Sequence, residues 1–365
     1  STDGRGGVQA FLGNGSERIR VPEVQTRGEL VLRFPHFDSE LRLGSGTALE
    51  GVWIKRRGKH ESTRIPVRRS PAPGRFCFSR PAIGSAPRDW CIGRFRVKFA
   101  RSADPAVGVF RRVDGQDHDL EGTFLTTLGD YRFLAGNTYH RGFSLSCFDG
   151  AHAFLFRAEH QQADNSIRGE FWSSDTWHET WTGVRDDHAA LPDGFGLTRC
   201  TEGVRLGGTI LRDLTGKQRT LDDAALRGTV RLIDVFGSWC PNCHDHGSYL
   251  AELHRRYAAK GLRVIGVAFE QDDDFARSVR QVRAFAKRHR ATFPMWIGGV
   301  ADKKGATTAL RLLDRVRAFP TTLFVDRRGV VRGVYQGWSG PAAKSENARL
   351  RQRFEQRIDE LLAEK

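Results

Sequence analysis

Apolar and polar residues alternate in a series of short runs through the first half of the chain. In the clearest run, Phe95, Val97 and Phe99 alternate with arginine and lysine, which is typical of a half-buried strand. Similar runs recur about every ten residues, with turn pairs such as Asp149-Gly150 between them. They cover residues 29–34, 51–56, 120–126, 131–134, 143–148, 153–158 and 167–172, and no convincing helix precedes about residue 220. This pattern predicts an all-β domain, an antiparallel meander curled into a barrel or a sandwich.

The spacing of apolar residues changes in the second half of the chain. An apolar, β-branched run at residues 230–236 predicts a buried strand, and helical spacing follows it through Leu250, Leu253 and Tyr257. Further strands are expected at residues 209–213, 262–269, 293–297, around Leu323 and at 330–335, and further helices at 275–290, 302–314 and 347–362. This β-α-β then β-β-α order predicts an α/β domain.

A polar stretch marked by glycine and proline separates the two patterns. Asp186-Asp187 and Pro192-Asp193-Gly194 lie in it, and it continues to Gly203. We therefore predict a β-rich domain over residues 1–190, a linker over 191–203 and a second domain over 204–365.

Two cysteines stand where the buried strand at residues 230–236 gives way to a helix. The sequence is Trp239-Cys240-Pro241-Asn242-Cys243, and proline suits the first helical turn because its missing N–H costs nothing there. A thiol at a helix N-terminus faces unpaired N–H groups and the positive end of the helix dipole, and both stabilise the thiolate. The second thiol is close enough to attack a disulfide made by the first. The pattern predicts a dithiol redox site.

Residues 204–365 resemble the thioredoxin-fold domain of the TlpA/ResA-like thiol–disulfide oxidoreductases. The resemblance is carried by the strand, the W-C-x-x-C motif that includes Trp239, the following helix, and the later strand at residues 319–326. It implies an α/β thioredoxin fold with a cis Pro320 beside the cysteine pair. Asp234, six residues before Cys240, matches the buried acid of thioredoxin. His246 departs from the family pattern, which places glutamate there.

These residues define the expected reaction. Cys240 attacks a disulfide of a client protein, and Cys243 resolves the mixed disulfide. Asp234 lies near the end of an otherwise apolar strand and is expected to accept the proton of Cys243. His246 lies on or near the same helical face as Cys243. The alternative for His246 is a side chain that points to solvent. The resemblance favours reduction of clients, and an upstream thiol reductase as the source of electrons.

Three alternatives stay open. A zinc site needs a second pair of ligands, and the nearby donors His244 and His246 follow Cys243 too closely to complete a tetrahedron easily. A peroxiredoxin-type peroxidase would carry the motif P-x-x-x-T/S-x-x-C, which is missing before Cys240, where Phe236 and Gly237 stand. The β-rich domain could instead be a non-enzymatic module that binds clients. The preferred interpretation requires no cofactor and no metal.

Net charge is unevenly shared between the two predicted domains. The chain carries +15, of which residues 1–203 hold +3 and residues 204–365 hold +12. An arginine-rich composition with solvated faces explains this most simply, and the alternative is an acidic partner or an anionic membrane surface near the redox domain. Nothing else in the sequence supports nucleic-acid binding. The family resemblance implies the bacterial periplasm or cell envelope.

The other cysteines and one aromatic cluster give weaker signals. Cys77 and Cys91 bracket a Pro/Gly-rich stretch and could form a disulfide, although spacing alone does not fix pairing. Cys147 is expected to be a buried thiol, and Cys200 has no evident mate. The aromatic, histidine-containing run at residues 171–181, with Trp177, His178 and Trp181, is interpreted as packing rather than a catalytic site.

Overall fold

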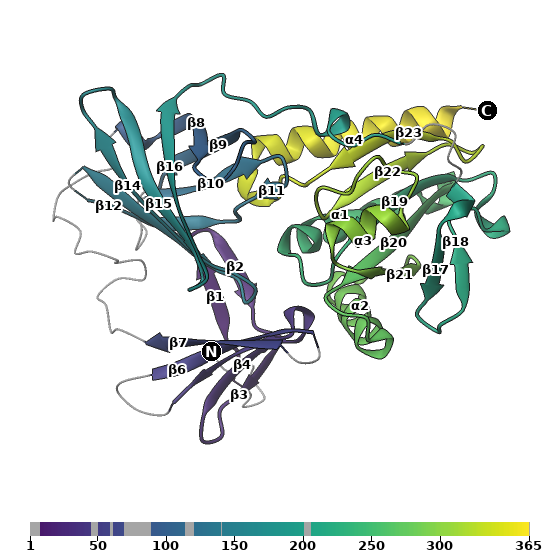
Figure 1. Ribbon diagram of the computed structural model, residues 1–365, viewed down its shortest axis with the longest axis horizontal. Coiled ribbons are helices and arrows are strands. Elements are labelled where there is room, and N and C mark those ends of the chain that lie inside the picture. The colour runs from purple at the N-terminus through teal and green to yellow at the C-terminus, as the bar shows by residue number, and fades with distance from the viewer. Residues whose placement is uncertain are drawn as a thin grey trace. The chain divides into compact units, whose positions relative to one another are not determined.

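The computed structural model describes residues 8–44, 50–58, 61–68, 89–113, 120–139, 141–200 and 206–364. The chain divides into two units (Figure 1), and each is described by itself. Unit 1 comprises residues 1–56 and 62–191, and unit 2 comprises residues 57–61 and 192–365.

Unit 1 is built from strands, as the alternating pattern predicts. A hairpin and a five-stranded antiparallel sheet come first, formed by β1 (Phe11–Asn14), β2 (Glu17–Arg20), β3 (Glu23–Gln25), β4 (Leu30–Phe34), β5 (Ser39–Leu43), β6 (Glu50–Arg57) and β7 (Glu61–Arg68). A larger sheet follows, formed by β8 (Gly93–Phe99), β9 (Ala106–Arg112), β10 (Leu120–Thr126), β11 (Gly129–Asp130), β12 (Leu134–Tyr139), β13 (Gly142–Phe148), β14 (Ala153–Gln161), β15 (Ser166–Ser173) and β16 (Trp177–Arg185).

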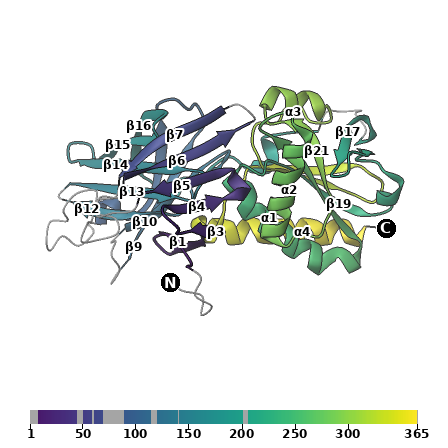
Figure 2. The same cartoon turned by 90° about the horizontal axis from the view of Figure 1, so that it is seen from below.

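The larger sheet closes into an eight-stranded antiparallel barrel. Strands β12 to β16 pair in sequence, β16 pairs with β8, and β9 joins β8 to β10, which pairs with β12. Figure 2 shows β9, β10 and β12 to β16 gathered in one group of strands. An eight-stranded barrel leaves an interior that side chains can fill. Phe124 stacks on Phe156 at 4.4 Å between ring centroids, and Phe156 stacks on Phe171 at the same distance. The interior is therefore an aromatic core.

The structure corrects one predicted strand and clarifies the aromatic run. The strand expected at residues 131–134 begins only at Leu134, because Arg132 has a φ of 64° that interrupts an extended backbone. Trp181 lies in the barrel core, whereas Trp177 is 42% exposed. Cys147 is buried as expected and forms no disulfide. Cys77 lies outside the described residues, so its pairing with Cys91 stays a prediction.

Unit 2 has a seven-stranded mixed sheet in the order β18-β17-β21-β20-β19-β22-β23 (Figure 1). Its strands are β17 (Ile210–Asp213), β18 (Gln218–Thr220), β19 (Val230–Phe236), β20 (Leu262–Glu270), β21 (Met295–Val300), β22 (Thr321–Val325) and β23 (Val331–Gln336). Its helices are α1 (Pro241–Tyr257), α2 (Phe275–His289), α3 (Lys303–Ala309) and α4 (Ser345–Ala363). Strands β19, β20 and β21 are parallel, and β22 and β23 are antiparallel to their neighbours. This arrangement is a thioredoxin fold, as the sequence predicted.

Two segments of unit 2 differ from the expected pattern. The helix predicted over residues 302–314 ends at Ala309, and the apolar residues Leu310, Leu312 and Leu313 are buried in the turns that follow. Within the segment interpreted as a linker, Phe195 packs against Tyr335 of β23, and Cys200 forms an isolated β-bridge with Leu313. Among the described residues, no helix is long and apolar enough to cross a membrane.

Candidate active site

The central strand of unit 2 delivers the cysteine pair to the start of α1. Strand β19 is buried along its whole length between β20 and β22. A turn closes after it, with the Cys240 N–H donating to the Gly237 carbonyl at 3.1 Å. Cys240 is the N-cap of α1 and Pro241 is the first helical residue. The thiol therefore stands at the N-terminal end of the helix dipole, where negative charge is stabilised.

The two thiols differ in access. Cys240 is 9% exposed and its thiol donates to the Phe319 carbonyl at 3.4 Å, whereas Cys243 is completely buried. Burial raises the pKa of Cys243 well above its usual value, and a hydrogen bond to Cys240 and the charge of Asp234 raise it further. Both cysteines are reduced in the structure. Cys240 is thus the thiol that a substrate can reach, and Cys243 holds its proton at neutral pH.

Trp239 and the Phe319–Pro320 peptide frame the exposed edge of Cys240. The Trp239 indole N–H donates to the Phe269 carbonyl at 3.0 Å, and its ring meets the Phe319 ring edge-on at 5.7 Å. The Phe319–Pro320 bond is cis, as the family resemblance implied. Trp239 lies in the turn between β19 and α1, and Phe319 and Pro320 lie in the segment before β22. The fold therefore brings together residues that are 80 positions apart in sequence.

Beneath the pair lies a buried Asp234–His246 contact. Asp234 on β19 is 2% exposed, and its Oδ1 lies 3.1 Å from Nδ1 of His246 on α1. Thr322 Oγ1 lies 3.5 Å from the same carboxylate oxygen. The His246 ring is fully buried and lies 4.4 Å from the Trp338 ring, centroid to centroid. The alternative of a solvent-exposed His246 is therefore wrong, and its side chain faces Asp234.

The two histidines that follow Cys243 point to different partners. His244 contacts the Ser238 carbonyl and His289, whereas His246 contacts Asp234. Within the ranges that the structure describes, no three side chains of His, Cys, Asp or Glu converge as a metal site would require. Three polar residues that the sequence analysis did not select, Ser238, Glu270 and His289, form hydrogen bonds with one another or with His244 around the turn before Cys240.

Gly237 permits the close approach of Trp239. A Cβ at this position would lie 2.3 Å from Trp239 Nε1 and 2.6 Å from Trp239 Cε2. We expect Gly237→Ala to displace the indole and to lower the free energy of unfolding by about 1–3 kcal/mol, the usual cost of overpacking. Urea denaturation measures this loss. Gly196→Ala is the control, since nothing lies within 4 Å of a Cβ there, and its effect should stay within about 0.5 kcal/mol. Equal stability of the two variants would contradict the close packing of Trp239.

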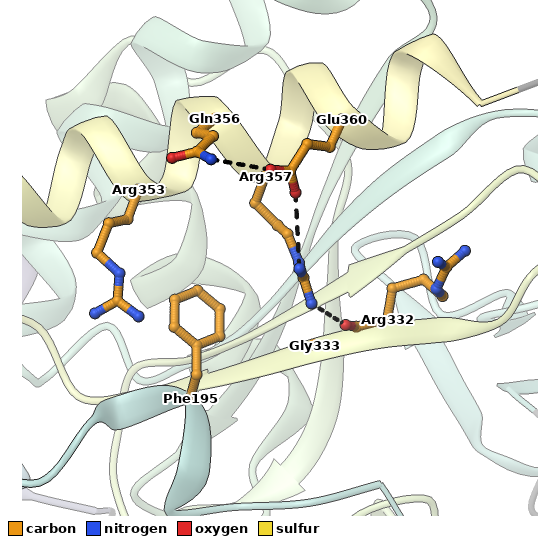
Figure 3. Close-up of a pocket in the computed structure, with 7 residues that line it drawn as sticks. All are labelled: Phe195, Arg332, Gly333, Arg353, Gln356, Arg357 and Glu360. Carbon is orange, nitrogen blue, oxygen red and sulfur yellow. Dashed lines mark hydrogen bonds and ion pairs between the residues drawn. The ribbon is translucent and has the colours of Figure 1, made fainter.

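A separate surface pocket of about 380 Å³ lies between α4 and β23 (Figure 3). Its arginines are already engaged. Arg353 pairs with Asp193 and covers the Phe195 ring, and Arg357 binds the Arg332 carbonyl and lies 3.7 Å from Glu360. None of the residues at the cysteine pair lines this pocket. It therefore offers no unmatched cationic group to an anion and has no part in the dithiol site.

Comparison with known proteins identifies the relatives of unit 2. Residues 207–334 match the AhpC/TSA family. The thioredoxin-like protein YneN of Bacillus subtilis is 32% identical over 136 residues, which cover 37% of this chain and 72% of YneN. The thiol-disulfide oxidoreductase ResA of Bacillus cereus is 29% identical over 122 residues, which cover 33% of this chain and 62% of ResA, less than two thirds of its length.

A solved structure is also similar to part of this chain. It is a thiol:disulfide interchange protein of the thioredoxin family from Chlorobium tepidum, with 17% identity and a TM-score of 0.33, and the match covers 45% of this chain and all of that one.

Proposed function

The chain belongs to the thioredoxin-like thiol–disulfide oxidoreductases of the TlpA/ResA type, and we propose that it reduces disulfide bonds of client proteins through Cys240 and Cys243. One observation carries the proposal. A reachable thiol at the N-terminus of α1 stands next to a completely buried thiol that can resolve its disulfides. We assign the reaction to the predicted domain over residues 204–365.

The proposed reaction transfers two electrons from the dithiol to the client. The Cys240 thiolate attacks one sulfur of a client disulfide, the client S–S bond breaks, and the released client thiolate takes a proton. Cys243 then loses its proton and attacks the Cys240 sulfur, which releases the second client thiol and leaves a Cys240–Cys243 disulfide. An upstream thiol reductase must return two electrons and two protons to complete the cycle.

The other site residues have supporting roles in this proposal. The Asp234–His246 pair accepts the proton of Cys243, because these two buried side chains contact each other and the charge of Asp234 acts on Cys243. Trp239 and Pro320 border the thiol that meets the client. The proposal includes pairing of an extended client segment with the backbone of Phe319 at this border, as in strand addition.

Reduction of insulin by the full chain with dithiothreitol tests the proposed function. We expect catalysed precipitation of the insulin B chain. Equilibration with glutathione should give the Cys240/Cys243 pair a reduction potential of roughly −270 mV, as in reductants of the thioredoxin kind. The buried acid favours this direction, since negative charge opposes the thiolate and disfavours the reduced dithiol. A value close to roughly −120 mV would reverse the direction to oxidation of clients.

The AhpC/TSA match favours a second candidate, a thiol peroxidase. The peroxidatic motif is missing before Cys240, so we rank this activity second. Peroxide consumption measured beside insulin reduction separates the two, and faster turnover of peroxide would make the peroxidase the primary function. We place the chain in the bacterial periplasm or cell envelope, on the resemblance to the TlpA/ResA type.

A further inference from the structure

Ser238 has all three of its polar groups engaged by ionisable side chains. It is 1% exposed and lies two residues before Cys240. Its N–H donates to Glu270 Oε1 at 3.0 Å, and its hydroxyl donates to Glu270 Oε2 at 2.6 Å. Its carbonyl lies 2.7 Å from His244 Nε2. The turn that presents the nucleophile is thus held from β20 on one side and from α1 on the other.

On the histidine side of this turn, the Ser238 carbonyl fixes which atoms donate in the hydrogen bonds of His244. A carbonyl only accepts, so His244 Nε2 must carry the hydrogen, and the neutral ring then accepts at Nδ1. His289 Nε2 lies 2.7 Å from that Nδ1 and must donate to it. Ser248 Oγ lies 2.7 Å from His289 Nδ1 and 3.2 Å from the His244 carbonyl oxygen, and its single hydroxyl hydrogen serves one of these two acceptors at a time. Burial and the charge of Arg288 lower the pKa of His289 to about 3, so the His289 ring is neutral near neutral pH.

The glutamate side behaves differently. Glu270 is completely buried, and burial raises its pKa to about 7. The hydrogen bonds from Ser238 and the charge of Arg277 on α2 act in the opposite direction, and Asp272 adds to the rise. Arg277 and Asp272 are themselves paired at 3.1 Å. On the α1 side the facing group is His244, through Ser238. Glu270, which holds the turn through both of its carboxylate oxygens, therefore changes charge in the neutral range.

We propose that Glu270 is a positioning residue that couples its own charge to the reactivity of Cys240 through Ser238, while His244 fixes the same turn from the other side. This inference rests on the proposed function, in which Cys240 is the nucleophile. An ionised Glu270 places negative charge beside the turn and opposes the thiolate, whereas a protonated Glu270 does not. As the pH rises, Cys240 should therefore gain less nucleophilicity than an isolated thiol would.

Alkylation of Cys240 by iodoacetamide tests the coupling without any client. The full chain with Cys243→Ser is used as the parent, and peptide mass spectrometry quantifies modification at Cys240 from pH 5.5 to 9. In Glu270→Gln the amide can keep both hydrogen bonds to Ser238 without the charge. We expect its alkylation rate to equal that of the parent at pH 6 and to exceed it about threefold at pH 8.

Four further variants separate the effect of the Glu270 charge from the effect of the turn's geometry. Ser238→Ala removes one hydrogen bond to the carboxylate, so the inflection near pH 7 should move to higher pH. His244→Leu removes the donor to the Ser238 carbonyl and should lower the rate about threefold at every pH without moving the inflection, whereas His244→Gln can donate there and should restore it. Glu252→Gln on α1, which pairs with Arg351 and does not contact Ser238, is the matched neutralisation control and should behave as the parent.

Two outcomes would overturn the inference. One is a Glu270→Gln profile identical to that of the parent, and the other is an inflection that Ser238→Ala leaves in place. Because alkylation needs no client, a chain that fails to reduce insulin but shows the expected profiles would reject the proposed function and not the coupling.

Discussion

Cys240→Ser is expected to abolish the reduction of insulin, to the background set by dithiothreitol, a loss of about a hundredfold or more. Serine cannot attack a disulfide under these conditions, and the remaining thiol cannot take over. Cys243 is completely buried, and burial raises its pKa well above the usual value, so it is neither reachable nor ionised. The turbidity assay on the full chain measures the loss.

Cys243→Ser should have a different effect. Cys240 still attacks, but nothing resolves the mixed disulfide, so covalent complexes with clients accumulate and appear on non-reducing gels. Cys200→Ser is the matched control, since Cys200 is another cysteine of unit 2 and lies at an isolated bridge with Leu313. That variant should turn over at the parental rate. Normal turnover of insulin by Cys243→Ser would show that the two-cysteine mechanism is wrong.

Local sequence predicted the parts of the structure that local interactions determine. The apolar run of β19, the proline after Cys240 and the helical spacing beyond it place the nucleophile at an N-cap without reference to the rest of the chain. The alternation of Phe95, Val97 and Phe99 likewise fixes the inner face of one barrel strand. Strand β16 was missed because its inward positions include Glu179 and Gly183 besides Trp181, which hides the alternation.

The supporting residues of the site could not be predicted in the same way. The position of His246 depends on Trp338, 92 residues away, whose ring covers it and leaves Asp234 as its polar neighbour. Ser238 and Glu270 are 32 residues apart, and His244 and His289 are 45 apart. Each residue alone matches an ordinary strand end or helix face. Only the packing of β20 and α2 beside α1 makes them one hydrogen-bonded group.

The second large effect is expected at the resolving step. Cys243 must lose its proton in a site from which water is excluded, and burial, the neighbouring thiol and the charge of Asp234 all hold that proton on the sulfur. A base beneath the thiols removes this obstacle if it takes the proton as the new S–S bond forms. Asp234 Oδ1 and His246 Nδ1, 3.1 Å apart, are the acid–base pair that we assign to this step.

Asp234→Asn should slow resolution about tenfold or more at pH 7, within the usual range for a positioned base. The measurement uses 5,5′-dithiobis(2-nitrobenzoate) in a Cys200→Ser background. Attack by Cys240 releases one thionitrobenzoate in a fast phase, and resolution by Cys243 releases the second in a slow phase. Only the slow phase should change, because Asn keeps the size of Asp234 in its buried position on β19. The first phase is therefore an internal control for an intact fold.

The pH dependence of that slow phase distinguishes a base from a packing residue. Without the carboxylate, hydroxide or water must take the proton. The slow-phase rate of Asp234→Asn should therefore approach that of the parent steadily as the pH rises. His246→Ala should give a smaller deficit, since the carboxylate remains but loses its neighbour at 3.1 Å. If the two residues acted only in packing, each variant would be slower than the parent by the same factor at every pH. If neither variant altered the pH profile, water would be the proton acceptor, and both residues would leave the mechanism.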